Sequence, residues 1–390
     1  MIISSPTILG LNLDLVNNKE IFNKINSNVR DPFDENISFY MNEAHSPGLS
    51  ACIVINDSVV WERGYGYANI NKKINATADT IYLGASISKT ITATAIMQLC
   101  EKGLFDLDED VSNFLPFDLR NPKYPDKKIT FRMLLSHHAS FAYGDWKTQP
   151  IIYLLFSLFG TSKERYFELL TPSGILYNPR IWIDSEPGDT LQYSNIGYFI
   201  LEYLVELLSN QSFEEYCTTH IFDPLEMYNT SYQLSNYEKN EISTPYVWVL
   251  NSYIPLPNYE FKNYGVAGVR TSAKDLSHFL IANINGGDYK GKHILNEETI
   301  ELMRTIQFPD SNHNQWYQYG LGWRVIFRND SYFLWHPGTG PGVATYINYN
   351  PVDKIGIIFF VNQYPIIMSY DIMTWMNILY LLYEKAYSFS

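Results

Sequence analysis

"LSACIVINDSVVWERGYGYANI", residues 49–70, is the stretch that says most about the fold. Two runs rich in β-branched and aromatic residues flank the polar turn Asn56-Asp57-Ser58, a pattern typical of a β-hairpin. Gly64 and Gly66, near the end of the second run, indicate a bend or bulge there. We therefore expect an antiparallel hairpin close to the start of the folded chain.

Outward from this hairpin the chain changes from strands to helices and back to strands. "SISKTITATAIMQLCEKG" has apolar residues at helical spacing and a stop at Gly103. Residues 116–261 are typical of helical segments joined by loops, and strand-like runs return as "YGLGWRVIF", "SYFLWH", "VATYINYN" and "KIGIIFFVN". A last helix is predicted from about Ile367 to Ala386, whereas residues 1–35 lack strong periodicity and are predicted to form an N-terminal arm.

This order of elements predicts an α+β fold. Because strands at both ends of the chain flank a helical middle, the simplest assembly is one antiparallel sheet flanked by helices. Residues 36–115 and 262–390 would build that sheet domain, and residues 116–261 would form an all-α insert.

The charge balance excludes some classes of partner. Against 41 acidic residues the 390-residue chain has 28 basic ones, a net charge of -13, so nucleic-acid binding is not expected and acidic substrates are not favoured. The start of the chain lacks the pattern of a signal peptide, and no run reaches about 18 uninterrupted apolar residues. We expect no integral membrane segment and a soluble protein, cytoplasmic or otherwise intracellular. Composition leaves the oligomeric state open.

Metal and disulfide chemistry is not indicated either. Cys52, Cys100 and Cys217 are widely separated and lack the C-x-x-C spacing of zinc or redox sites. The chain has no His-x-x-x-His pattern, which disfavours a zinc hydrolase. His137 and His138 are adjacent, so on a helix they would point in different directions.

"GASISKT", residues 84–90, raises the first chemical question. Ser86 and Lys89 are three residues apart at a predicted helix start, so their side chains lie on one face. A serine is a good nucleophile only when a base takes its proton, and a lysine can do so if its pKa falls from about 10.4 toward about 7 to 8. The alternative is a helix-capping serine followed by a solvent-facing lysine.

A second group of candidate residues lies in "PGDTLQYSN", residues 187–195. Tyr193 follows a Pro-Gly turn and precedes a predicted helix, so it can project from a loop into a cleft. Asn195 can cap that helix and bind a substrate amide. The alternative for Tyr193 is a half-buried aromatic residue of the helical insert.

The third group is "WHPGTGPG", residues 335–342. His336 begins a glycine-dense strand, and glycines such as Gly338 let a substrate backbone lie close to a strand. Thr339 could present its backbone N–H to the same oxyanion as Ser86. The alternative is a loop between strands. Lys354 is a rival for this position, but it precedes a continuous apolar strand and is expected to belong to the core.

Taken in order, Ser-x-x-Lys, Tyr-x-Asn and a His-x-Gly strand resemble the serine β-lactamase and penicillin-binding-protein superfamily. The chain is most similar to the class C β-lactamase and D-alanyl-D-alanine carboxypeptidase branch. Several flanking segments also resemble that branch, among them "LLSHHAS", "PGDTLQYSNIGY", "VAGVRTSAKDLSHF" and "YGLGWRV". The resemblance covers about residues 36–365. It implies a β-lactamase/transpeptidase-like fold in which the all-α insert forms the other wall of the cleft.

Roles for the candidate residues follow from the resemblance. It implies that Ser86 is acylated, that Lys89 lowers its pKa or accepts its proton, and that Tyr193 is the partner general base and acid. Asn195 would bind the substrate amide. His336 and Gly338 would belong to the inner strand, and the N–H groups of Ser86 and Thr339 would form the oxyanion hole. The resemblance implies a small-molecule or peptide substrate, with no metal and no organic cofactor.

The third motif departs from the family pattern. β-Lactamases have Lys-Thr-Gly where this chain has His336-Pro337-Gly338. A histidine with a pKa near about 6.5 is mostly neutral at pH 7, so it binds a substrate carboxylate less well than a lysine. We therefore expect a serine hydrolase acting on an ester, amide or small peptide, with weak or absent β-lactam hydrolysis.

Other interpretations stay open at this point. Within the enzyme class, the alternative is a penicillin-binding D-alanyl-D-alanine carboxypeptidase or β-lactamase. In another class, the chain would be a catalytically inactive β-lactamase-like protein for binding or assembly. The apolar run "PIIYLLFSLFG", residues 150–160, is either a wall over the cleft or a core helix.

Overall fold

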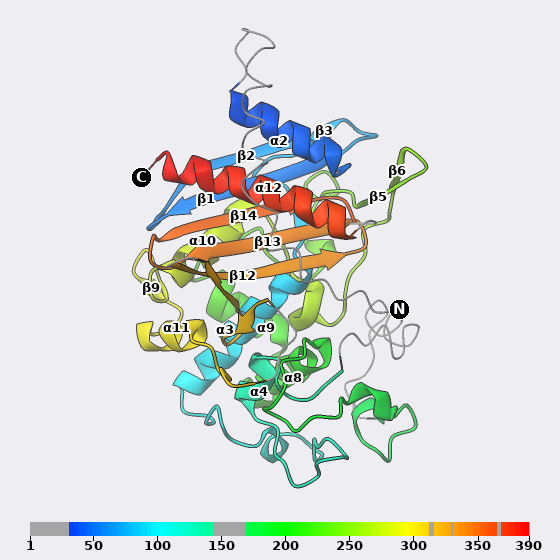
Figure 1. The fold of residues 1–390 in the computed structure, drawn as a ribbon, viewed down its shortest axis with the longest axis vertical. Coiled ribbons are helices and arrows are strands. Elements are labelled where there is room, and N and C mark those ends of the chain that lie inside the picture. Colours follow the sequence, from blue (N-terminus) through cyan, green and yellow to red (C-terminus); the bar gives the residue numbers. More distant parts are fainter. Residues whose placement is uncertain (1–30, 143–167, 312–315, 329–330, 365–367, 390) are drawn as a thin grey trace.

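The protein's computed structural model describes residues 31–142, 168–311, 316–328, 331–364 and 368–389. Within these residues the main sheet consists of β1 (Gly48–Ile55), β2 (Ser58–Asn69), β3 (Ile74–Asn75), β10 (Gln318–Tyr319), β11 (Arg324–Arg328), β12 (Ser331–Gly340), β13 (Val343–Asn350) and β14 (Ile355–Val361). The strand order is β10-β11-β12-β13-β14-β1-β2-β3, and neighbouring strands are antiparallel. The hairpin near the N-terminus is therefore joined through β1 to the last strand of the chain (Figure 1).

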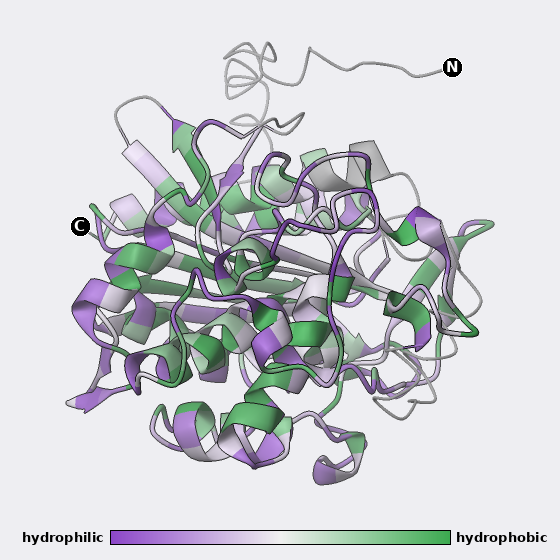
Figure 2. Ribbon diagram, turned by 90° about the horizontal axis from the view of Figure 1, so that it is seen from below, coloured by the Kyte–Doolittle hydropathy of each residue, from purple (hydrophilic) through white to green (hydrophobic). Residues whose placement is uncertain are grey.

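Helices lie on both faces of this sheet. The described α-helices are α2 (Pro32–Glu43), α3 (Ser88–Glu101), α4 (Phe131–Leu135), α8 (Asn195–Ser209), α9 (Phe213–Cys217), α10 (Ala273–Ile284), α11 (Glu297–Arg304) and α12 (Met368–Tyr387). Short 3-10 or π turns are η3 (Ala85–Ile87), η4 (Val111–Asn113), η5 (Pro179–Ile181), η6 (Thr218–Phe222), η7 (Leu234–Asn236) and η8 (Tyr264–Gly268). Figure 2 shows that many of the loops between these elements are hydrophilic.

The sequence of β1 explains why the sheet has two covered faces. Side chains alternate across a strand, so its residues divide between two sides. Cys52 and Val54 belong to one hydrophobic core, whereas Leu49, Ala51 and Ile53 belong to the other. All five are fully buried, so both faces of the central strands are apolar and the run is almost continuously hydrophobic.

The outer core is closed by α2 and α12, which lie side by side across the sheet (Figure 1). Trp375, Ile378 and Leu382 recur at helical spacing on α12 and are fully buried against the sheet. Burying each such side chain is worth about 1.5–3 kcal/mol, which explains how one amphipathic helix stays attached.

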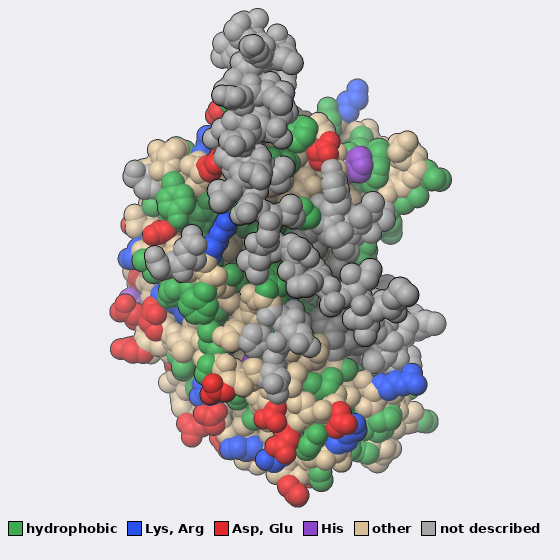
Figure 3. Space-filling view, viewed as in Figure 1, with side chains coloured by type: hydrophobic (Ala, Val, Ile, Leu, Met, Phe, Trp, Pro, Cys, Tyr) green, Lys and Arg blue, Asp and Glu red, His purple; other side chains and the backbone are tan. Residues whose placement is uncertain are grey.

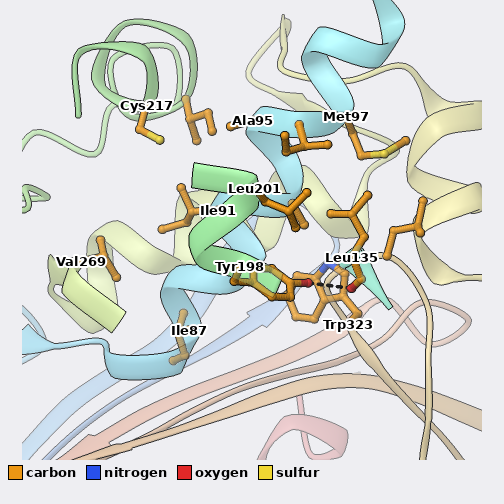
Figure 4. Close-up of a cluster of buried hydrophobic side chains, with 14 of the residues drawn as sticks. Ile87, Ile91, Ala95, Met97, Leu135, Tyr198, Leu201, Cys217, Val269 and Trp323 are labelled. Carbon is orange, nitrogen blue, oxygen red and sulfur yellow. Dashed lines mark hydrogen bonds between the residues drawn. The ribbon is translucent and has the colours of Figure 1, made fainter. Parts of the chain in front are cut away.

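The inner core contains the helices that position the candidate site. Figure 4 shows α3 crossing beside α8, with Ile91, Leu201 and Trp323 in the same buried cluster. Tyr198 of α8 donates a hydrogen bond from its hydroxyl to the Leu135 carbonyl at 2.7 Å. This bond ties α8 to the end of α4 and satisfies a fully buried hydroxyl.

Small two-stranded sheets complete the architecture. They are β4 (Tyr82–Leu83) with β7 (Arg270–Thr271), β5 (Tyr246–Val249) with β6 (Ser252–Pro255), and β8 (Asp288–Tyr289) with β9 (Lys292–His293). The β5-β6 hairpin lies within the predicted all-α insert, where the sequence analysis did not anticipate it. Its turn residues Leu250 and Asn251 have φ values of 49° and 57°, as a two-residue hairpin turn with matching twist requires.

The predicted fold class, an antiparallel sheet flanked by helices, is confirmed. The domain boundaries at residues 115 and 261 stay predictions. The predicted arm at residues 1–35 overlaps α2, which begins at Pro32, and residues 1–30 lie outside the described residues. The same holds for the apolar run 150–160.

The pairing of β2 is irregular at two places. Its register against β1 shifts between Ile53 and Val54, and its register against β3 shifts between Tyr67 and Asn69, directly after Gly66 and close to the predicted bend or bulge. Gly66 does have a positive φ of 65°, a conformation that favours glycine.

The visible surface carries both charge signs. In Figure 3, acidic and basic side chains are interspersed on the face shown, without a large basic patch among the coloured residues. Among the helices that the structure describes, none has the length and apolarity needed to cross a membrane.

Candidate active site

Ser86 occupies the middle of η3, directly before α3. It is half-buried within a stretch whose other residues are buried. The neighbouring Ala85 has a positive φ of 47°, an uncommon conformation for a residue with a side chain. Ser88 fixes this turn, because its Oγ donates to the Ala85 carbonyl at 2.8 Å and accepts from the Val269 N–H at 3.0 Å. The turn that contains Ser86 is therefore fixed by hydrogen bonds and has a strained backbone at Ala85.

Lys89 lies one helical turn after Ser86 and is fully buried. Its Nζ donates to Ser86 Oγ at 3.2 Å and to the Val266 carbonyl at 2.8 Å. The same Nζ lies 5.2 Å from the centre of the Tyr193 ring and 5.8 Å from that of Tyr198. The lysine is therefore not a solvent-facing residue of the helix.

Tyr193 approaches Ser86 from the opposite side, out of the extended segment before α8. Its hydroxyl donates to Ser86 Oγ at 3.1 Å, across a sequence separation of 107 residues. The predicted helix cap is wrong by one residue, because Ser194 is the N-cap and accepts from the Ile196 N–H. Asn195 is the first residue of α8 and is half-buried.

Strand β12 runs directly past the serine. A Cβ built on Gly338 would lie 3.0 Å from Ser86 N and only 2.2 Å from Thr345 Oγ1, so a side chain there would push the strand away. Thr339, the next residue, is exposed. Strand β11 pairs with residues 331–335 of β12, which leaves residues 336–340 paired on one side, with β13. The other edge of this segment is not paired with a described strand.

His336, which begins this segment, is fully buried. Its Nδ1 lies 2.9 Å from the Pro337 carbonyl oxygen, a geometry that places the ring proton on Nδ1. Its Nε2 is buried without a hydrogen-bond partner among the described residues. The ring centre lies 6.3 Å from that of Tyr193.

His137 is a site residue that the sequence analysis missed. It follows the C-cap of α4 with a φ of 62°, so it is not on a helix as assumed. Its ring lies 4.4 Å from the Tyr193 ring, and its Nδ1 accepts from the Ser194 N–H at 3.2 Å. His138 instead contacts Ser136 Oγ at 3.0 Å. The sequence signal was the "LLSHH" segment, which gave no hint of the positive φ.

Arg324 is a second missed residue. Its guanidinium lies 5.4 Å from the centre of the Tyr193 ring and 4.3 Å from that of Tyr317. Its Nε donates to Tyr319 Oη at 3.1 Å. The site thus has a cation packed on the aromatic rings beside Tyr193, at energies of about 0.5–2 kcal/mol per contact.

The electrostatics of the site keep its histidines neutral. Burial, with the positive charges of Arg324 and Lys89, lowers the pKa of His336 well below its usual range. Burial likewise lowers the pKa of His137, with Lys89 and His336 adding to the effect. At neutral pH both rings are therefore uncharged, and His336 does not supply the positive charge that a lysine would supply at its position in β12.

These two pKa shifts predict a pH-dependent stability. In the unfolded chain a histidine binds a proton near pH 6.5, whereas the buried rings of His137 and His336 do so only at lower pH. The unfolded chain therefore binds more protons below pH 6.5, and the free energy of unfolding falls as the pH falls. We expect the free energy of unfolding, measured by urea denaturation, to be lower at pH 5.5 than at pH 7.

A His336→Asn variant is the matched comparison, because its amide can still donate to the Pro337 carbonyl. The decrease in the free energy of unfolding between pH 7 and pH 5.5 should be smaller in this variant, because one of the two histidines no longer contributes to it. Equal decreases in the two proteins would show that His336 is protonated in the folded state.

The described residues offer no cluster of three or more histidine, cysteine, aspartate or glutamate side chains placed to hold a metal ion. Cys52, Cys100 and Cys217 are free thiols.

The chain is similar in sequence to several known bacterial proteins. Protein flp of Staphylococcus aureus (strain MW2) is 27% identical over 342 residues, which cover 87% of this chain and 64% of that protein. The match thus spans less than two thirds of that relative. The putative penicillin-binding protein PbpX of Bacillus subtilis (strain 168) is 28% identical over 343 residues, covering 84% of this chain and 74% of PbpX.

Solved structures share the fold. The octameric penicillin-binding protein homologue from Pyrococcus abyssi aligns with a TM-score of 0.71 and 27% identity, over 85% of this chain and 73% of that one. A class C beta lactamase from Rhodobacter sphaeroides aligns with a TM-score of 0.69 and 17% identity, over 91% of this chain and 99% of that one, which shows the fold alone. The sequence model of the family described as Beta-lactamase matches residues 33–375. The chain therefore belongs to the beta-lactamase family.

Proposed function

We propose that the protein is a serine hydrolase that forms an acyl-enzyme on Ser86. The observation that carries this proposal is the pair of hydrogen bonds to Ser86 Oγ, from Lys89 Nζ at 3.2 Å and Tyr193 Oη at 3.1 Å. A serine that only capped a helix would need neither partner. Two proton-transfer groups within reach of one hydroxyl are the arrangement by which a serine becomes nucleophilic.

The chemistry begins with proton transfer from Ser86 Oγ to the neutral amine form of Lys89 or to the phenolate form of Tyr193. The oxygen then attacks the substrate carbonyl carbon, forming a C–O bond, and the carbonyl electron pair becomes the oxyanion. The backbone N–H groups of Ser86 and Thr339 stabilise this charge. When the intermediate collapses, the bond to the leaving group breaks and Tyr193 supplies the proton that the leaving group takes. Water then attacks the acyl-serine and gives a proton to Tyr193. The bond between Ser86 Oγ and the acyl carbon breaks, Ser86 regains its proton, and the acid is released.

Substrate binding follows from the strand beside the serine. Residues 336–340 of β12 have one unpaired edge, so an extended acyl chain can add to it by backbone hydrogen bonds. The close approach of Gly338 to Ser86 N brings this edge to the nucleophile. Asn195, at the start of α8, is proposed to bind the substrate amide.

The substrate class is proposed as an ester, amide or small peptide. A neutral His336, its pKa lowered by burial and by Arg324, gives a substrate carboxylate at this strand position no charged partner. The alternative is a penicillin-binding D-alanyl-D-alanine carboxypeptidase or β-lactamase. Its penicillin-binding part is supported by relatives described as a putative penicillin-binding protein and a penicillin-binding protein homologue. A catalytically inactive binding or assembly protein is the alternative of another class.

Intact-protein mass spectrometry tests the proposal. The protein is incubated separately with a fluorophosphonate, a short-chain aryl ester and a penicillin, and the modified residue is located by peptide mapping. We expect a fluorophosphonate adduct on Ser86 and turnover of the ester. A penicillin adduct together with cephalosporin hydrolysis at the rate of the best ester would favour the alternative enzyme. Absence of an adduct with all three probes would favour the binding or assembly protein.

A further inference from the structure

Arg270 is a buried cation that the proposed catalytic steps do not use. The residue is only 2% exposed. Its Nη2 donates to the Tyr259 carbonyl, but its Nε has no hydrogen-bond partner among the described residues. Within those residues no carboxylate forms an ion pair with it, and the nearby Glu260 is paired with Lys262. A buried charge without an anionic partner is costly, so this one calls for an explanation.

The side chain lines a pocket that contains a second unsatisfied group. Asn258, Tyr259 and Pro341 form other parts of the lining, together with Asn362. Asn362 Oδ1 is buried and has no hydrogen-bond partner among the described residues. The pocket therefore borders on one unused donor and one unused acceptor, of which a carboxylate can pair only with the donor, on Arg270.

The pocket lies at the end of the strand edge that passes the serine. Gly338 and Gly340 are two residues apart on β12, so they share one face. A Cβ on Gly338 would lie 3.0 Å from Ser86 N, and one on Gly340 would lie 3.1 Å from Tyr259 Oη. Tyr259 Oη in turn donates to the Pro341 carbonyl at 2.8 Å.

A second path connects the pocket to the nucleophile. Leu83, which also lines the pocket, pairs with Arg270 between β4 and β7 and is three residues before Ser86. From Gly338 to Pro341 the strand advances by about 10 Å. An extended acyl chain attached to Ser86 would need about this length to reach Arg270.

We propose that Arg270 binds a carboxylate at the far end of the substrate's acyl group. The preferred substrate is then an ester or amide of a peptide-like acyl chain that ends in an acid. Guanidinium and carboxylate form strong charge-assisted hydrogen bonds, and the side chain of Arg270 lines the pocket while its buried Nε has no partner among the described residues. The net charge of -13 repels acidic molecules at long range, but salt screens that repulsion beyond about 8 Å. This inference rests on the proposed acyl-enzyme function.

The test compares two aryl esters of equal length. One is the 4-nitrophenyl ester of N-succinyl-glycyl-glycine, which ends in a carboxylate, and the other carries the neutral succinamide instead. In the wild type we expect kcat/KM to favour the acid by at least ~10-fold, mainly through KM. Arg270→Gln should abolish this preference and Arg270→Lys should restore part of it. Lys262→Gln, which removes a nearby exposed cation outside the pocket lining, should keep it.

The outcomes separate this inference from the proposed function. 4-Nitrophenyl acetate is too short to reach Arg270, so its Ser86-dependent turnover tests the acyl-enzyme alone. Turnover of the acetate with equal kcat/KM for the two long esters would overturn the role of Arg270. So would a preference that survives in Arg270→Gln. If the melting curve shows that Arg270→Gln does not fold, two other results test the role of Arg270. They are the ratio of kcat/KM for the acidic and neutral esters in the wild type and the decrease of that ratio in Arg270→Lys.

Discussion

Replacing Ser86 with alanine is expected to abolish ester turnover and the fluorophosphonate adduct. The substitution removes the oxygen atom that accepts hydrogen bonds from both Lys89 Nζ and Tyr193 Oη. Without that oxygen no acyl-enzyme can form, and kcat should fall by at least ~10^4-fold. Because Ser86 is half-buried and its hydroxyl does not hold the turn together, the melting temperature should change little. Initial rates with 4-nitrophenyl acetate and intact-protein mass spectra measure both effects.

Ser88→Ala is the matched control for this variant. Ser88 is two residues away, and its hydroxyl bonds the Ala85 carbonyl and the Val269 N–H, which fixes the turn. We expect this variant to have a lower melting temperature but still to form the adduct. Turnover of Ser86→Ala at the wild-type rate would remove Ser86 from the mechanism.

Lys89→Met is expected to lower kcat by about 10^2- to 10^4-fold while leaving the protein as stable or more stable. Methionine fills a similar volume but has no nitrogen to accept a proton from Ser86. The variant leaves the Val266 carbonyl without its donor, at a cost of about 1–3 kcal/mol. It also removes a fully buried amine, whose charged form costs several kcal/mol to desolvate. The second effect is the larger, so the free energy of unfolding should not fall.

Kinetics and calorimetry together check this prediction. Lys102→Met, at the exposed C-terminal end of the same helix, should leave kcat unchanged and controls for the loss of a lysine from α3. A large drop in melting temperature for Lys89→Met with kcat preserved would show that Lys89 has a structural role instead.

Local patterns in the sequence correctly predicted the structural features that depend only on residues close together in the chain. The turn after the first strand, the stop at Gly103 and the strand runs near the C-terminus depend on backbone preferences and side-chain alternation, and each is in the structure. The predicted turn Asn56-Asp57-Ser58 is one residue too long, because Ser58 already pairs with Ile55. The proximity of Ser86 and Lys89 is also local, because residues three apart on a helix share a face. The hairpin at Leu250 and Asn251 was missed because its two strands are only four residues each.

The remaining site residues come together only through the tertiary fold. Tyr193 is 107 residues from Ser86, so no periodicity relates them, and only their order and the family resemblance pointed to a shared cleft. His137 was misjudged because its direction depends on a positive φ after the end of α4. Arg324 and Arg270 lie in the family-like segments "YGLGWRV" and "VAGVRTSAKDLSHF", but nothing in those segments marks the arginines as site residues. Their burial beside aromatic rings and carbonyls is a property of the packed chain.

The sequence by itself determined the fold class and the nucleophile candidate, because hydrophobic alternation, turn residues and helical spacing act over a few residues. The tertiary structure decided which charges surround that nucleophile. It buried Lys89 and placed Arg324 over the Tyr193 ring, and it made His336 neutral by removing it from water. These effects depend on desolvation and on distances between groups far apart in the chain, and both arise only when the sheet and the helical insert pack together.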